Sequence, residues 1–307
     1  GDFKQIEFHP QAKIMRWDNE VNFSLRWQND SLDIPEITQQ DKVTKYRKGK
    51  QELHVYDLDP SSLGEDGGLE IELLLDEKPD TNVFTFTLET KNLNFFYQPE
   101  LTNEEKLKGR VRPENVIGSY AVYHKTKRDN YADVHYKTGK AFHIYRPKVI
   151  DKNNNSVWAD LFIDEEKNLL TITVPQKFLD SAIYPIIIDP TFGYTSIGAS
   201  NAQTSLQETI ITRHQLTENG DISKTSLYCN ASTGGTINFK GLIYDDDGGT
   251  NEPGTRKGVG AEVAVSDTSP AWRDSTLTLS LSASFYYVGY IASNTTTPAL
   301  TVYYDSG

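Results

Sequence analysis

The chain of 307 residues carries 31 Lys and Arg against 43 Asp and Glu, a formal net charge of −12 at pH 7. This charge argues against nucleic acid as a partner, because affinity for phosphates depends on Lys and Arg displacing counterions. No apolar run approaches the ~20 residues of a membrane-spanning helix, so the sequence predicts no membrane span. The single cysteine, Cys229, excludes an intrachain disulfide, and we expect it in a core.

The composition favours an all-β chain with thin cores. With Gly counted in place of Tyr, roughly 38% of the residues are apolar, below the roughly 45–50% of typical globular domains. The 17 Tyr and 13 Phe favour strands, because broad side chains cover a pleated surface well. The length suits two or three domains. We therefore predict tandem β-sandwich or jelly-roll domains.

Alternating apolar and polar residues indicate the strands of the first half. Between Val21 and Trp27 every second residue is apolar, as in a strand that packs on one face. Similar patterns predict further strands at residues 52–58, 69–75, 82–90, 116–124, 140–146, 157–163 and 169–174. We expect segments 69–75 and 82–90 to pair with each other, and residues 175–182 to form a short helix.

The stretch Ala182–Gly193 separates two parts of the chain that differ in composition. Ile186, Ile187 and Ile188 predict a buried strand. Asp189-Pro190 is expected to end its pairing, because proline has no N–H for the ladder and holds the preceding residue extended. Residues 191–203 are small and polar, which favours a hinge, and no chemistry is assigned to the stretch.

This pattern divides the chain into two predicted regions. Residues 1–190 form a β-rich region of one or two sandwiches. The charged segment 98–115, with a helical turn at 103–108, is either a linker that breaks this region in two or a long surface loop within one sandwich. Residues 204–307 form a jelly-roll-like sandwich, with strands expected at 208–214, 222–229, 236–244, 275–281, 286–293 and 299–304. Because the chain begins at Gly1 and stops directly after a strand-like run, we expect it to be a portion of a longer protein.

Two groups of aromatic residues are candidates for carbohydrate binding. Aromatic faces stack on sugar rings, and the polar tips of Tyr and His bond sugar hydroxyls. The alternative interpretation is that these side chains line sandwich rims or fill a core. The candidates are Tyr123, His143 and Tyr145 in the first half, and Trp272, Tyr286 and Tyr290 in the second.

Asp245, Asp246 and Asp247 form the densest acidic cluster and are the candidate metal ligands. Calcium binds where several carboxylate oxygens converge. The segment is not an EF-hand loop, because Arg256 stands where the closing Glu belongs. The alternative is a solvated hairpin tip. No cofactor other than calcium is expected.

The sequence predicts a protein that is not an enzyme. It contains no G-x-S-x-G elbow, no H-E-x-x-H segment and no glycine-rich phosphate loop. Asp160 and Asp164 would suit the two carboxylates of a glycosidase, although carboxylates on neighbouring turns are usually only solvated. A glycoside hydrolase therefore stays as an alternative.

Short motifs resemble those of large β-rich proteins. Tyr184–Thr191, with the sequence YPIIIDPT, resembles the closing strand of modules in bacterial surface proteins of the Rhs and YD-repeat kind and in phage virion proteins. Gly241–Asp245, Pro253-Gly254, Trp272 and Tyr286–Tyr290 resemble jelly-roll modules of phage tail, virion and secreted adhesion proteins. The resemblance covers residues 116–307 and implies an external structural or attachment role, with carbohydrate binding in some such modules.

These observations support two hypotheses. The first is a structural or adhesion protein of a virus or phage particle or of a bacterial surface assembly, located in the virion or outside the cell. Its partners would be other copies of itself, other structural proteins or a surface glycan, reached in part through exposed strand edges. The second is a carbohydrate-binding module of a secreted protein.

Overall fold

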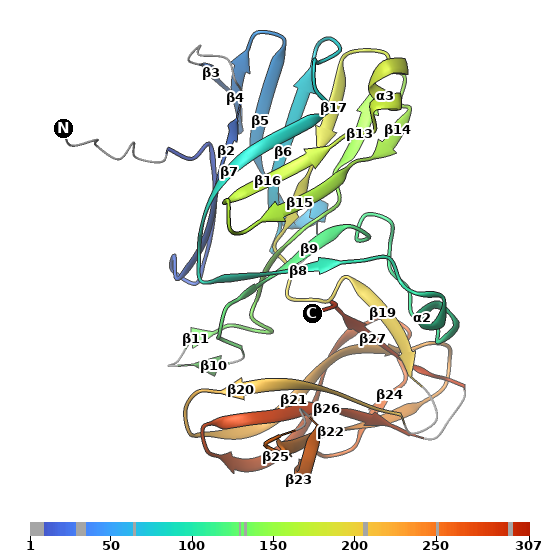
Figure 1. The fold of residues 1–307 in the computed structure, drawn as a ribbon. Helices are drawn as coiled ribbons and strands as arrows, with labels where there is room; N and C mark the ends of the chain where they lie inside the picture. Colours follow the sequence, from blue (N-terminus) through green and yellow to red (C-terminus); the bar gives the residue numbers. More distant parts are fainter. Residues whose placement is uncertain are drawn as a thin grey trace, which may run out of the picture. The chain divides into compact units, whose positions relative to one another are not determined.

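The computed structural model describes residues 9–28, 35–63, 66–128, 130–131, 134–204, 208–249, 252–293 and 297–307. The fold is all-β, as predicted, with only short helices between its strands (Figure 1). The chain divides into two compact units. Unit 1 holds residues 1–100, 113–196 and 305–307, and unit 2 holds residues 101–112 and 197–304.

Unit 1 contains a five-stranded antiparallel sheet. Its order is β1 (Ala12–Arg16), β2 (Val21–Gln28), β7 (Val83–Lys91), β16 (Leu169–Thr173) and β15 (Asp160–Asp164). The alternation predicted for the second strand is confirmed, because Val21, Phe23, Leu25 and Trp27 are all buried. The hairpin of β15 and β16 lies where strands are predicted at 157–163 and 169–174.

A second sheet of unit 1 has eleven strands. Its main path runs through β14 (Ser156–Trp158), β13 (Lys148–Asp151), β17 (Ile186–Asp189), β6 (Gly68–Leu75), β18 (Thr191–Gly193), β12 (Lys140–Ile144), β9 (Ser119–His124) and β8 (Leu93–Gln98). On the other side of β6 follow β5 (Gln51–Leu58), β4 (Val43–Lys48) and β3 (Glu36–Gln40). The remaining elements are a small hairpin, β10 (Asn130–Tyr131) with β11 (Val134–His135), and two short helices, α1 (Pro60–Leu63) and α3 (Gln176–Ser181).

The two sheets of unit 1 pack face to face around one core. Phe23 of the smaller sheet lies with its ring centroid 5.5 Å from that of Phe142 and 5.8 Å from that of Phe192, both of the larger sheet. Such pairs add about 0.5–1.5 kcal/mol beyond the burial of their area. The inward face of each sheet is therefore apolar, and its polar residues lie on the outward face.

The predicted pairing of segments 69–75 and 82–90 is wrong. These segments form β6 and β7, which belong to different sheets. β6 pairs with β5, whereas β7 pairs with β2 and β16. Alternation identifies the buried face of a strand, but both strands bury an apolar face in the same core, so it cannot identify the partner strand.

The prediction that pairing ends at Asp189-Pro190 is also wrong. Ile188 lies opposite Leu73, and beyond the proline Thr191 lies opposite Glu70, so β17 and β18 pair with β6 in one unbroken register. Proline removes a single donor from the ladder. The residues before and after it still pair with β6, so the pairing is interrupted only at Pro190.

Unit 2 is a second two-sheet sandwich. Its four-stranded sheet has the order β19 (Ser200–Thr204), β27 (Leu300–Tyr304), β21 (Gly220–Ala231) and β25 (Ala271–Leu281). Its five-stranded sheet contains β20 (Thr209–Leu216), β26 (Ser284–Ala292), β22 (Ile237–Asp246) and β23 (Pro253–Val259), with β24 (Val263–Val265) also on β22. The sandwich predicted for this part is confirmed, and the jelly-roll connectivity stays a prediction.

The core of unit 2 joins small and aromatic side chains. Cys229 and Val302 of one sheet pack with Phe239 and Tyr290 of the other. Cys229 is fully buried, as expected. The short helix α2 (Asn103–Leu107) also belongs to this unit, and Thr102 and Glu105 form a capping box at its N-terminus.

The predicted boundaries lie at identifiable places in this division. The segment expected as a break, 98–115, contains the piece 101–112 that belongs to unit 2. The segment expected as a hinge, 191–203, contains β18 and part of β19, and the chain passes from unit 1 to unit 2 after Ser196. Hinge motion there stays a prediction.

Candidate functional site

Three aromatic rings lie side by side across neighbouring strands of unit 2. Trp272 of β25 lies opposite Tyr228 of β21, and their ring centroids are 5.4 Å apart. Tyr303 of β27 lies on the other side of Tyr228, at 5.3 Å. We call Trp272, Tyr228 and Tyr303 the aromatic row. Of the six predicted sugar-binding residues, Trp272 is the one that lies in it.

The aromatic row faces outward because of the strand alternation. Cys229 and Val302, which are the sequence neighbours of Tyr228 and Tyr303 and lie opposite each other, are buried on the inner face. Trp272 is 40% exposed, and the two tyrosines are half-buried. The row is therefore a surface from which an aromatic face can contact a ligand.

Polar side chains surround the row on the same face. Asn201 of β19 lies opposite Tyr303. Two residues along the strands, Asp274 accepts hydrogen bonds from Lys224 Nζ at 2.8 Å and from Ser226 Oγ at 2.7 Å. The hydrogen bond from Lys224 lowers the pKa of Asp274, so this carboxylate and the ammonium group form a neutral pair. The face offers amide and hydroxyl groups together with apolar rings.

The structure does not bring Tyr286 and Tyr290 to this surface. Both tyrosines are buried in the interior of unit 2. Tyr290 packs against Phe239 with ring centroids 6.5 Å apart, and burial raises its pKa. The hydroxyl of Tyr286 donates to the carbonyl oxygen of Ser282 at 2.9 Å. These rings pack in the core, as the alternative interpretation of the sequence has it.

The other three predicted residues share the outward face of the larger sheet in unit 1. His143 lies opposite Ala121, two residues from Tyr123, and the His143 and Tyr145 rings are 4.6 Å apart. His143 is fully buried, and its Nε2 is 2.7 Å from Ser119 Oγ. The structure therefore brings the three together, in a site that is largely closed to solvent.

Residues at the end of the chain contribute to this closure. Asp305 accepts a hydrogen bond from the Tyr123 hydroxyl at 2.8 Å and forms an ion pair of 2.8 Å with Lys140. Both members of the ion pair are buried, with side-chain exposures of 0% and 3%. Burial and the adjacent carboxylate raise the pKa of Tyr123 well above its ordinary value. Sequence reasoning missed Lys140 and Asp305, because the two residues lie far apart in the chain and no local pattern relates them.

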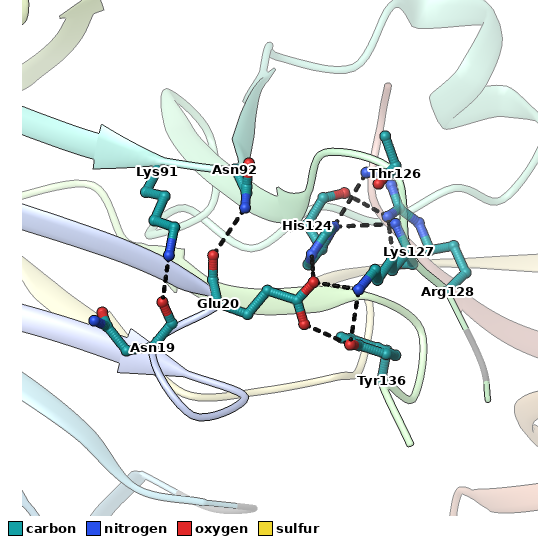
Figure 2. A network of polar contacts seen from close by, with 9 residues as sticks. All are labelled: Asn19, Glu20, Lys91, Asn92, His124, Thr126, Lys127, Arg128 and Tyr136. Carbon is teal, nitrogen blue, oxygen red and sulfur yellow. Dashed lines mark hydrogen bonds and ion pairs between the residues drawn. The ribbon is translucent and has the colours of Figure 1, made fainter. Parts of the chain in front are cut away.

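A second cluster that sequence reasoning missed surrounds Glu20 (Figure 2). Glu20 is the last residue of the tight turn between β1 and β2, in which Trp17, Asp18 and Asn19 have positive φ. Its carboxylate accepts hydrogen bonds from Lys127 Nζ and from the Tyr136 hydroxyl. Burial acts to raise the pKa of Glu20, but these hydrogen bonds outweigh it and lower the pKa to about 2. Glu20 is therefore ionised at any physiological pH.

His124 completes this cluster in a defined tautomer. Its Nδ1 accepts hydrogen bonds from the backbone N–H groups of Thr126 and Lys127 at 3.1 and 3.0 Å. The ring proton is therefore on Nε2, which is 3.4 Å from Glu20 Oε1. Burial lowers the pKa of His124, so the ring is neutral near pH 7. The cluster joins the β1–β2 turn to the segment after β9, as Figure 2 shows.

Two carboxyl groups also meet in unit 1 without a cationic side chain at hydrogen-bond distance in the described residues. Glu70 of β6 is 6% exposed, and Thr191 donates to its Oε2 at 3.2 Å. Burial and the neighbouring Asp189 raise the pKa of Glu70 to about 9. Near pH 7 the pair holds one proton, because two such carboxylates cannot both be ionised at low cost.

Each of the three predicted calcium ligands has a partner within the chain, and for two of them this partner is a cationic side chain. Asp245 forms an ion pair of 2.9 Å with Lys257, and Asp246 accepts from Arg213 Nε at 2.7 Å. Asp247 Oδ1 accepts from the N–H of Gly249 at 3.2 Å. Among the residues that the structure describes, no three His, Cys, Asp or Glu side chains lie close enough to hold a metal ion. Calcium binding here stays a prediction.

The two carboxylates considered for a glycosidase also have cationic neighbours. Asp160 lies 3.3 Å from Arg146, and Asp164 lies 2.8 Å from Lys167. Asp164 takes part in the turn after β15, where its Oδ1 also accepts from the backbone N–H of Lys167. Asp164 stabilises the hairpin turn, whereas Asp160 is a surface residue whose side chain is 82% exposed.

Comparisons with known proteins identify no relative of this chain. Neither the family models nor the curated proteins include a match to this chain. Within the described part of the chain, no helix has the length and apolar character needed to cross a membrane. The described residues form an all-β protein of two sandwich units, and the aromatic row lies on the outward face of unit 2.

Proposed function

We propose that the chain is a structural or adhesion protein of a virus or phage particle or of a bacterial surface assembly. It acts through contacts with other copies of itself or with other structural proteins, and in part with glycan. It works outside the cell or in the virion. The resemblance of residues 116–307 to surface and virion modules supports this proposal. The main support comes from the exposed edge strands of the sheets in unit 1.

Large apolar side chains are exposed on the edge strands of unit 1. Phe162 on β15 is 58% exposed and Met15 on β1 is 53% exposed, at the two edges of the five-stranded sheet. Ile37 on β3 is 61% exposed. In the described residues each of these strands pairs on one side only. An open edge beside an apolar side chain can bind a strand of another molecule.

The buried polar clusters support a structural role as well. Glu20 and Lys127 connect segments that are far apart in the chain, and so do Lys140 and Asp305. The Lys140–Asp305 pair is buried, and breaking a buried pair leaves an uncompensated charge, so this pair keeps its segments in place. A rigid module that presents surfaces to its partners needs this kind of internal connection.

The edge of β15 can be tested by charge substitution. We expect the wild-type protein to self-associate as its concentration rises, and Phe162→Lys to weaken that association by at least about tenfold, because a lysine on an edge strand opposes pairing. Val83→Lys is the matched control, since Val83 is 40% exposed on the inner strand β7. The measurement is light scattering after size exclusion. Equal association of both variants would remove this edge from the proposal.

The aromatic row favours a second candidate, a carbohydrate-binding module of a secreted protein. Such a module would bind polysaccharide as a monomer, without being assembled into a virion or a surface structure. Binding by a strict monomer, with no association at any concentration, would favour this candidate over the first.

A further inference from the structure

We infer that the aromatic row of unit 2, Trp272, Tyr228 and Tyr303, is the binding site for a neutral, linear polysaccharide. The inference rests on the proposed adhesion function and deepens it, because it names the class of ligand and the residues that hold it. The chain of sugars would lie across strands β25, β21 and β27.

The spacing of the rings suits a polymer of sugars. Neighbouring strands are about 4.8 Å apart, so the outer rings of a row across three strands are about 10 Å apart, the length of a disaccharide. Tyr228 meets Trp272 at an interplanar angle of 63° and Tyr303 at 72°. It packs edge-on between them and holds their positions. Trp272 and Tyr303 can then stack on alternate sugars of one chain.

The polar groups near the row can complete the recognition. A sugar has an apolar C–H face for an aromatic ring and hydroxyl groups that both donate and accept hydrogen bonds. Asn201 beside Tyr303 and Ser226 beside the Lys224–Asp274 pair provide such partners on the same face. A protein partner would instead need a desolvated apolar pocket for an anchoring side chain.

The charge near the row selects a neutral ligand. The only ionised groups placed on this face next to the row by the described registers are Lys224 and Asp274, and they form an ion pair of 2.8 Å. Arg273, next to Trp272 in sequence, forms an ion pair of 2.6 Å with Asp267. Positive and negative charges are therefore balanced, and the face has no excess of either to attract a charged polymer.

The rings carry the binding, so their removal gives the test. The probes are soluble β-glucan, xylan and mannan, with hyaluronan and heparin as acidic polymers, in affinity electrophoresis and calorimetry. We expect at least one neutral polymer to bind. Trp272→Ala and Tyr303→Ala should each weaken that binding by at least about tenfold, because stacking is lost.

Phe285→Ala is the matched control for the substitutions. Phe285 is 36% exposed on the other sheet of unit 2, under the guanidinium of Arg213, so it tests loss of an exposed ring away from the row. It should leave binding unchanged, and circular dichroism should show that all variants fold. Lack of binding to every neutral polymer, preference for the acidic polymers, or binding that survives Trp272→Ala would overturn the inference. Self-association through β15 is measured separately, so its presence without glycan binding would refute this inference alone.

Discussion

Glu70 and Asp189 show how a single pair of residues can make stability depend on pH. The pKa of Glu70 is about 9 in the folded protein, above the ordinary 4.5, because of burial and the adjacent carboxylate. A raised pKa means that the folded state binds the proton more tightly than the unfolded state. The stabilisation is therefore complete below about pH 4.5 and is lost as the pH rises toward 9.

Glu70→Gln should remove this dependence, because an amide can donate to Asp189 at every pH. We expect the free energy of unfolding of the wild type to fall by at least ~1 kcal/mol between pH 5 and 9, and that of the variant to stay nearly constant. Urea denaturation at pH 5, 7 and 9 measures both. Glu72→Gln, on the same strand, is the control and should keep the decline. A flat wild-type profile would contradict the shared proton.

Glu20 behaves in the opposite direction. Hydrogen bonds from Lys127 and Tyr136 lower its pKa to about 2, so its stabilising effect is present above about pH 4.5 and is lost as the pH falls toward 2. Glu20→Gln should lower the free energy of unfolding at pH 7 by about 1 kcal/mol, after allowance for partial exposure. Glu89→Gln, at an exposed position on β7, should change it little. Equal stability of both variants in chemical denaturation would show that the Glu20 cluster contributes nothing.

Single residues were predictable from sequence only where a local pattern determines their environment. The buried positions of β2 follow from alternation, and Cys229 was expected in a core. Glu20 and Lys127 are separated by 107 positions, and Lys140 and Asp305 by 165, so no local pattern relates them. Trp272 could be selected as an aromatic residue, but Tyr228 and Tyr303 join it only through strand register.

At the scale of elements, the sequence predicts where strands lie better than which strands pair. Segment 69–75 was predicted as a strand and corresponds to β6, yet its expected partner belongs to the other sheet. Pairing depends on loop paths and on a core shared by many strands, neither of which a short window contains. Pro190 lacks the backbone N–H that donates to the neighbouring strand, yet β18 continues to pair with β6 beyond it. A single missing donor therefore interrupts the hydrogen bonds between two strands without ending their pairing.

At the scale of the whole molecule, the amino-acid composition is enough to predict the all-β fold class. The alternation of apolar and polar residues is enough to predict the sandwich of unit 2. The abundance of Tyr and Phe and the short alternating segments predicted an all-β chain, and the structure has one. The division into units involves contacts that join residues 101–112 to 197–304, and residues 305–307 to the first unit. Such long-range contacts follow from the packed fold, and they cannot be predicted from the amino-acid composition.

The proposed role places this protein on a particle or a cell surface, where it acts by contact. Immunogold labelling of intact particles and intact cells from the source culture tests it most directly, because an antibody reaches only protein that is external. We expect label on the particle or on the cell surface, at a regular position if the protein is structural. Label absent from both, with the protein recovered only from the cell interior, would contradict the proposed external role.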